Sequence, residues 1–213
     1  MGLFSPDGAW WWDGARWVAT TGIQLVLPET EFERSGGLKA ARKLMTIREW
    51  IFVGMYVAGI TVIGLPLILV LVIAYWIVQF RAYKAYRQWT LELLSLATAQ
   101  LLDPDEPMLA CETTIYPRTG FWPSMRRDNA IAVARAHVLM FWFDHFDSPA
   151  IRVVFAARPP DVDLMLINGW IRISLVVAHQ GRRWFLPGIR GIPKGQQVID
   201  AWRNVLVASA SRQ

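Results

Sequence analysis

A short polar cluster, Asp144–Asp147 (Asp-His-Phe-Asp), carries residue types that can ligate a metal ion or move a proton. One imidazole and two carboxylates are suitable ligands for a divalent metal. The cluster lies where a β-prone run gives way to a turn, and aspartate is common in turns because its side chain hydrogen-bonds the local backbone. No second group of ligands follows, and His137 and His179 stand alone. We therefore predict no metal site, no cofactor and no catalytic residue.

Basic residues of the C-terminal half are the second candidate for chemistry. They are Arg126, Arg127, Arg182, Arg183, Arg190 and Lys194. Such groups, gathered by loops at one end of a domain, bind the phosphates of anionic lipid headgroups, so we predict a lipid or anion site there. The alternative is a solvated basic face that lies against a membrane. The formal net charge is +5, but no long run of Lys and Arg supports binding of nucleic acid.

The N-terminal stretch holds several of the chain's 12 Trp residues. The turn dipeptide Asp13-Gly14 between aromatic runs predicts a β-hairpin with strands at Ala9–Trp12 and Arg16–Ala19. Residues two apart in a strand share a side, so Trp10, Trp12 and Trp17 are expected on one face. This face either docks a peptide or a membrane surface, or it only stabilises a hairpin too small for an ordinary core.

The same stretch contains a Trp-Trp-Asp-Gly-x-x-Trp pattern at Trp11–Trp17, shortly after a Pro-Asp pair. This pattern resembles a short Trp-rich domain of unknown function found in bacterial membrane proteins. The resemblance covers about a tenth of the chain. It implies a membrane-protein context and no particular chemistry.

The elements that position these residues are arranged around an apolar run, Trp50–Phe80, which contains no charged residue. Its length of about 31 residues exceeds the ~20 that cross a hydrocarbon core. The tripeptide Gly64–Pro66 near its middle predicts the tip of a helical hairpin, with arms from about Thr46 to Ile63 and from Pro66. Both flanks are basic, which favours a hairpin with both ends in the cytoplasm. The alternative is one long, tilted helix kinked at Pro66.

In residues 103–213 the pattern of apolar residues changes from long helical stretches to short β-prone runs. Seven β-prone runs are separated by turn signals and followed by an amphipathic helix at Lys194–Ala208. The runs are Met108–Tyr116, Ala130–Ala134, Val138–Phe143, Ile151–Ala156, Leu164–Ile167, Ile171–Ala178 and Arg183–Leu186. Strands followed by one terminal helix predict a small antiparallel barrel or sandwich that this helix closes.

That order of elements resembles the pleckstrin-homology-like (PH-like) domains of bacterial membrane proteins, which often follow a short membrane hairpin. The resemblance rests on the hairpins Ala130–Phe143 and Ile171–Leu186 and on the closing helix with Trp202. It covers roughly the last half of the chain. It implies binding or oligomerisation rather than catalysis.

The sequence thus predicts a membrane-anchored α+β protein in four parts. These are a Trp-rich hairpin module (1–27), a linker (28–45), a transmembrane helical hairpin with a juxtamembrane helix (46–102), and a PH-like domain (103–213). We expect a non-enzymatic binding or scaffold protein of the plasma (inner) membrane. Its soluble parts would be cytoplasmic and recognise a protein partner, a second copy or anionic lipid. The alternative is a membrane enzyme or transport accessory that acts on a lipid.

Overall fold

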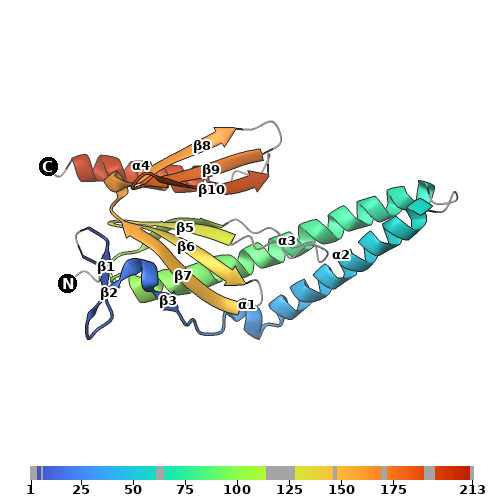
Figure 1. The fold of residues 1–213 in the computed structure, drawn as a ribbon, viewed down its shortest axis with the longest axis horizontal. Coiled ribbons are helices and arrows are strands. Elements are labelled where there is room, and N and C mark those ends of the chain that lie inside the picture. The colour runs from blue at the N-terminus through green and yellow to red at the C-terminus, as the bar shows by residue number, and fades with distance from the viewer. Residues whose placement is uncertain are drawn as a thin grey trace. The chain divides into compact units, whose positions relative to one another are not determined.

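The computed structural model describes residues 4–5, 7–60, 65–113, 128–145, 148–168, 172–189 and 195–211, and it has an α+β fold (Figure 1). The chain forms two compact units. The β unit contains the N-terminal residues up to Pro28 and the described residues from Leu93 onward, and the helical unit contains residues 29–92. The predicted module 1–27 and domain 103–213 therefore share one unit.

The larger sheet of the β unit is antiparallel, with strand order β3-β7-β6-β5-β4. Its strands are β3 (Gln24–Leu25), β4 (Met108–Thr113), β5 (Asp128–Ala134), β6 (Val138–His145) and β7 (Ser148–Ala157). Val, Ile, Phe and Ala dominate β5, β6 and β7, as expected of strands with a covered face.

The second sheet has the order β10-β9-β8. It comprises β8 (Asp163–Asn168), β9 (Arg172–His179) and β10 (Arg182–Ile189), all antiparallel. The turn between β9 and β10 consists of Gln180 and Gly181, whose φ angles are 48° and 74°. Two consecutive positive φ angles belong to the tight hairpin turn that matches strand twist.

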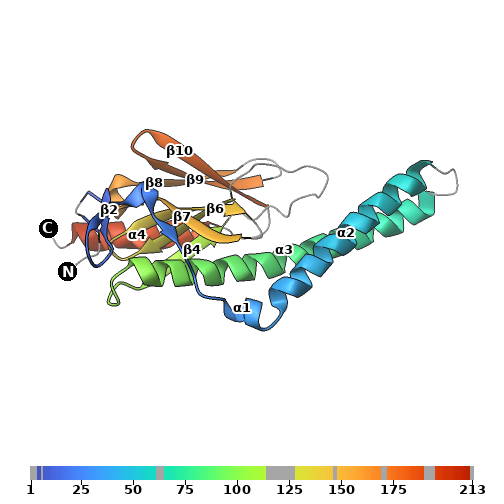
Figure 2. The same cartoon turned by 60° about the horizontal axis from the view of Figure 1, so that its bottom comes forward.

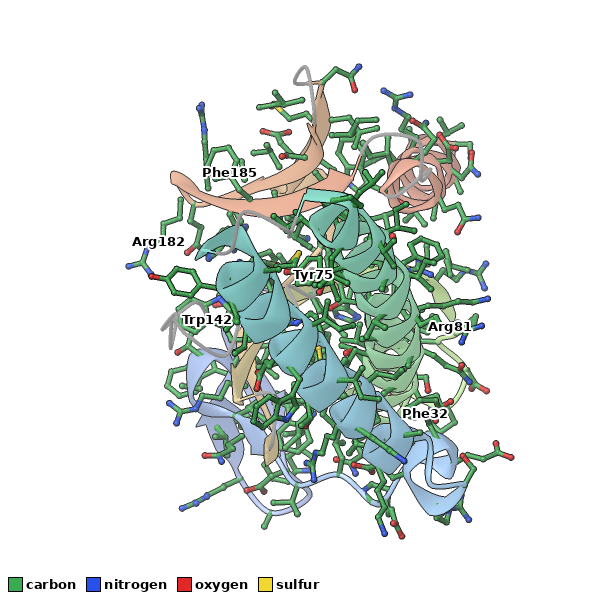
Figure 3. The ribbon with its side chains drawn as sticks, turned by 90° about the vertical axis from the view of Figure 1, so that its right-hand side faces the viewer. Phe32, Tyr75, Arg81, Trp142, Arg182 and Phe185 are labelled. Atoms are coloured by element: carbon green, nitrogen blue, oxygen red, sulfur yellow. The ribbon has the colours of Figure 1, made fainter. Side chains whose placement is uncertain are left out.

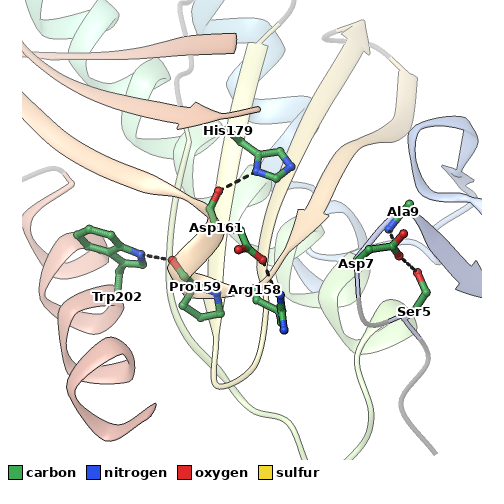
Figure 4. A network of polar contacts seen from close by, with 8 residues as sticks. All are labelled: Ser5, Asp7, Ala9, Arg158, Pro159, Asp161, His179 and Trp202. Carbon is green, nitrogen blue, oxygen red and sulfur yellow. Dashed lines mark hydrogen bonds and ion pairs between the residues drawn. The ribbon is translucent and has the colours of Figure 1, made fainter. Parts of the chain in front are cut away.

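One hydrophobic core joins the two sheets and the helix α4 (Gln196–Ala210). Val133, Met140, Val177 and Leu186 come from the sheets, and Val198 comes from α4. The indole Nε1 of Trp202 donates to the carbonyl oxygen of Pro159 at 2.9 Å (Figure 4). This bond attaches α4 to the 3-10 turn η3 (Pro159–Asp161).

The structure therefore confirms the general part of the predicted barrel or sandwich, which is antiparallel sheets followed by a helix. No sheet formed by the described residues closes on itself. Each of the seven predicted runs overlaps one of the strands β4 to β10, and the strands after β4 extend beyond their runs at one or both ends. The end of the first run, residues 114–116, lies outside the described part of the chain.

The N-terminal segment forms a separate two-stranded sheet and contributes one strand to the larger sheet. It forms β1 (Trp10–Trp12), β2 (Trp17–Ala19), the 3-10 turn η1 (Thr20–Gly22) and then β3, which pairs with β7 (Figure 2). Gly8 has φ 69°, and a Cβ there would lie 2.0 Å from the carbonyl oxygen of Ala156 in β7. Only glycine permits so close an approach at this backbone conformation.

The helical unit begins with α1 (Glu31–Arg34), capped by a reciprocal pair of hydrogen bonds between Thr30 and Glu33. The predicted linker 28–45 thus contains α1 and the start of α2 (Gly37–Ile60). The third helix, α3 (Leu65–Leu101), has Pro66 in its first turn, where a missing N–H costs nothing, and its last residues belong to the β unit. Gly64, in the predicted tip, lies outside the described residues.

Contacts between described residues join α2 to α3. Arg48 Nη1 donates to Gln79 Oε1 at 2.9 Å, and the rings of Phe52 and Tyr75 lie 6.4 Å apart. A Cβ on Gly54 would lie 3.8 Å from Cδ1 of Leu71. From Arg48 to Phe52 to Gly54 the residue number rises along α2, while the number of the α3 partner falls from Gln79 to Tyr75 to Leu71. The two helices therefore run antiparallel.

Candidate functional site

The aromatic face of the N-terminal hairpin consists of Trp10, Trp12 and Trp17. Trp12 pairs directly with Trp17, and their rings lie 5.5 Å apart. Trp10 stands two residues before Trp12 and so shares its side of the ribbon. About half of the Trp17 surface is exposed (50%). The three rings thus share one face of the hairpin, as their spacing predicts, and Trp10 is also about half exposed (49%).

The turn that brings these rings together depends on Asp13. Its Oδ1 accepts hydrogen bonds from the backbone N–H groups of Ala15 at 2.9 Å and Arg16 at 2.8 Å. These bonds lower the pKa of Asp13 below its ordinary value, because they stabilise the carboxylate form. Gly14 follows with φ 99°. The Asp-Gly pair therefore fixes the hairpin, although the return strand starts at Trp17 rather than Arg16.

The predicted basic set is placed only in part. Arg182 and Arg183 open β10, and both are exposed. Arg126, Arg127, Arg190 and Lys194 lie outside the described residues. The structure therefore does not test whether the six residues gather into one site.

An apolar surface that the sequence analysis missed lies beside these arginines, on the outer face of the three-stranded sheet. Met165 in β8 and Phe185 in β10 both pair with Val176 in the central strand, so all three share a face. Ile167 follows Met165 two residues later, and Met165, Ile167 and Phe185 are all exposed. Figure 3 labels Phe185 and Arg182, which come from the same strand. The signal was present: the β8 sequence Leu-Met-Leu-Ile is apolar at both phases of the strand repeat.

A carboxylate–imidazole pair also escaped the sequence analysis, because its members are 31 residues apart. The Nδ1 of His137 lies 2.8 Å from Oε2 of Glu106 and 3.0 Å from Oε1, and the backbone N–H of Ala136 donates to Oε1 at 2.8 Å. The Phe4 ring packs on His137 at 5.0 Å. Burial favours the neutral form of Glu106, but the bonds from His137 and the backbone outweigh it and lower the pKa.

This pair joins the loop before β4 to the turn between β5 and β6, so its evident role is structural. A shallow groove of about 360 Å³ lies nearby, between the start of β4 and the end of α4. Among its described lining residues, Arg135 is the one ionisable side chain. Acid–base catalysis needs titratable groups that converge on one point, and this groove does not supply them.

The described residues contain no group of three or more His, Cys, Asp or Glu side chains able to hold a metal. Asp144 and His145 end β6, and residues 146–147 lie outside the described chain. Ligation by Asp144–Asp147 is thus not tested.

The helices carry a third candidate surface, made of large apolar side chains on both α2 and α3. Trp76 and Leu69 are 65% and 64% exposed. Others that are more than two-fifths exposed are Trp50, Phe52, Tyr56, Val57, Leu67, Val70, Ile73, Ile77 and Phe80. In the described chain, one helix segment, Pro66–Leu101, is long and apolar enough to cross a membrane, with a mean hydropathy of 1.7 and 6% of the apolar window buried.

No protein-family model matches the chain, and neither a curated protein nor a solved structure matches it.

Proposed function

We propose that this chain is a membrane-anchored, non-enzymatic binding protein, held in the bilayer by α2 and α3. The exposed apolar surface of the two helices carries this proposal. Exposure of apolar surface to water costs about 25 cal/mol of free energy per Å². A surface with this many large exposed apolar side chains therefore needs an apolar solvent or a partner that covers it. A bilayer supplies that solvent for helices, whose backbone groups are already paired.

The antiparallel contacts between α2 and α3 support a membrane hairpin rather than one kinked helix. The contact that contains charge, between Arg48 and Gln79, lies within both helices, at the two ends of the apolar run Trp50–Phe80. Arg48 is 1% exposed and hydrogen-bonded, which is how a cation is accommodated near lipid. In this arrangement both soluble segments lie on the same side of the membrane. The basic residues that flank the apolar run favour the cytoplasmic side, by the positive-inside rule.

The β unit is the binding part in this proposal. The strands β4 to β10, in two antiparallel sheets, and the closing helix α4 support the predicted resemblance to PH-like domains, which bind proteins or lipid headgroups. Fold alone does not specify a ligand, so the binding surfaces are argued from their side chains. The aromatic face at Trp10, Trp12 and Trp17 and the β8–β10 surface are the two that the side chains favour.

The proposal is tested by measuring whether the chain is integrated into membranes and on which side of the membrane its two ends lie. After expression in a bacterial host, the chain should remain in membranes washed with alkaline carbonate and be released by detergent. Reporters fused at each end should both report a cytoplasmic location. Release by carbonate alone would reject the anchor, and an external signal from one end would reject the hairpin.

A further inference from the structure

The strand β8 lies at one edge of the three-stranded sheet. Among the described residues it pairs with β9 alone, so the backbone N–H and C=O groups along its other side have no strand partner there. Every residue of β8 except Leu164 and Leu166 is exposed. Unpaired backbone groups on an exposed edge are a template for pairing with a further strand.

The other edge strands of the three- and five-stranded sheets carry features that discourage pairing. Strand β10 begins with two arginines and contains Pro187, which has no N–H to donate. Strand β4 has an irregular register between Met108 and Ala110, and β3 is two residues long. Proteins block edges with charge, proline, bulges and short strands, but the four residues between Asp163 and Asn168 provide none of these. Strand β8 is therefore the edge that is suited to a partner.

A second copy of β8 fits this edge because the strand is self-complementary. In an antiparallel pair about a two-fold axis through Leu166, Met165 of each copy lies opposite Ile167 of the other. Met165 and Ile167 are 45% and 47% exposed, so each exposed apolar side chain gains an apolar neighbour. The two Asp163 carboxylates then lie roughly 20 Å apart along the strands, at opposite ends of the pair, so like charges do not face each other.

We propose that two copies of the chain pair through β8, so that their β8–β9–β10 sheets form one continuous antiparallel sheet. This inference rests on the binding role proposed above for the β unit, for which it names the partner. It does not require the helices to lie in a bilayer. Main-chain hydrogen bonds hold the pair together, and the side chains of Met165 and Ile167 set its register. The match of β8 with itself favours a second copy over an unrelated peptide.

The test measures self-association of the purified full chain in detergent micelles by sedimentation equilibrium over a range of concentrations. Met165→Lys with Ile167→Lys places like charges opposite each other in both halves of the pair. We expect the dissociation constant of the dimer to rise about tenfold or more. Both positions are exposed, so the variant should keep the unfolding midpoint of the parent chain. Phe185→Lys is the matched control, because Phe185 is 55% exposed but belongs to the opposite edge strand, and it should leave association unchanged.

A variant with opposite charges tests the register of the pair. Met165→Lys with Ile167→Glu changes the same two exposed positions, but it places each Lys opposite the Glu of the other copy. This variant should therefore associate about tenfold more tightly than the double Lys variant. General damage to β8 would weaken association in both variants alike.

A parent chain that is monomeric in detergent overturns the proposal and leaves the edge to a peptide partner. Equal association of the parent and the double Lys variant also overturns it, because the copies then meet elsewhere. The same holds if the Lys–Glu variant associates no better than the double Lys variant. The anchor is judged separately: a monomer retained in carbonate-washed membranes rejects only the pairing, and a β8-dependent dimer released by carbonate rejects only the anchor.

Discussion

The β unit and the helical unit place their apolar residues in opposite ways. In β5, Ile131 and Val133 are completely buried, and each belongs to a core shared with the second sheet. In α3, Leu69 and Trp76 have similar apolar character but expose about two-thirds of their surface. The proposed membrane anchor accounts for this difference, because a bilayer would cover the exposed side chains of α3.

This difference determines what each unit can tolerate. The β unit is close-packed, so a removed side chain leaves a cavity, and an added one meets atoms that cannot move. The exposed helix positions make few contacts within the chain, so a smaller apolar residue there costs little. A charge at such a position is costly in lipid and harmless in water.

The largest expected effect comes from charges on the exposed face of α3. Leu69→Arg with Ile73→Arg should abolish carbonate-resistant membrane association, because each Arg near the bilayer centre costs about 2.5–3.5 kcal/mol. Leu69→Phe with Ile73→Phe is the matched control and should remain integrated. If the double Arg variant stayed in the membrane, or became a better-behaved soluble protein than the parent, the contrast between the units would have another cause.

Next in size is a core truncation in the β unit. Met140 has no exposed surface and lies in the shared core, so Met140→Ala should lower the free energy of unfolding by about 2–5 kcal/mol. Denaturant unfolding in detergent, followed by near-ultraviolet circular dichroism, measures this. Val207→Ala, at an exposed position of α4, should change it by less than about 0.5 kcal/mol. Equal losses for the two variants would show that the core is not where the structure places it.

The contact between the N-terminal segment and β7 should respond to Gly8→Ala. A Cβ at this position meets the Ala156 carbonyl oxygen at 2.0 Å, so we expect a loss of about 1–3 kcal/mol and faster amide exchange in β1 and β2. Gly14→Ala shares the positive φ but has open space around its Cβ, and isolates the cost of backbone strain. Indistinguishable exchange in the two variants would mean that the segment does not pack on β7.

The smallest expected effect concerns the bond between Glu106 and His137. Because the pKa of Glu106 is lower in the folded than in the unfolded chain, its charge contributes stability above the ordinary value of 4.5. That contribution disappears as the pH falls through the folded pKa. Glu106→Gln should therefore cost about 1 kcal/mol at pH 7 and nearly nothing well below pH 4, by denaturant unfolding at both pH values. A cost that does not change with pH would contradict the charged pair.

Local signals in the sequence predicted most elements. The Asp13-Gly14 turn, the seven β-prone runs and the amphipathic pattern around Trp202 each act over a few residues, so the hairpin, the strands and α4 were predictable. The apolar run likewise marked the helices, with α3 beginning next to Pro66. These features depend on backbone preference and periodicity, which a single sequence contains.

Features that depend on distant contacts were not predictable. The pairing of β3 with β7 joins segments more than a hundred residues apart, so 1–27 was interpreted as a separate module. The bond between Arg48 and Gln79 joins residues 31 positions apart, and no local pattern indicates it. The β8–β10 surface was missed because its residues are adjacent only after strands pair. The basic set remains a prediction beyond Arg182 and Arg183.

The central claim, that α2 and α3 need lipid, is tested most directly by the state of the purified chain after detergent is removed. Sedimentation velocity and circular dichroism should show aggregation in plain buffer, and a folded, monodisperse particle when lipid nanodiscs are supplied. A folded monomer in plain buffer, with the native helix content, would contradict the account.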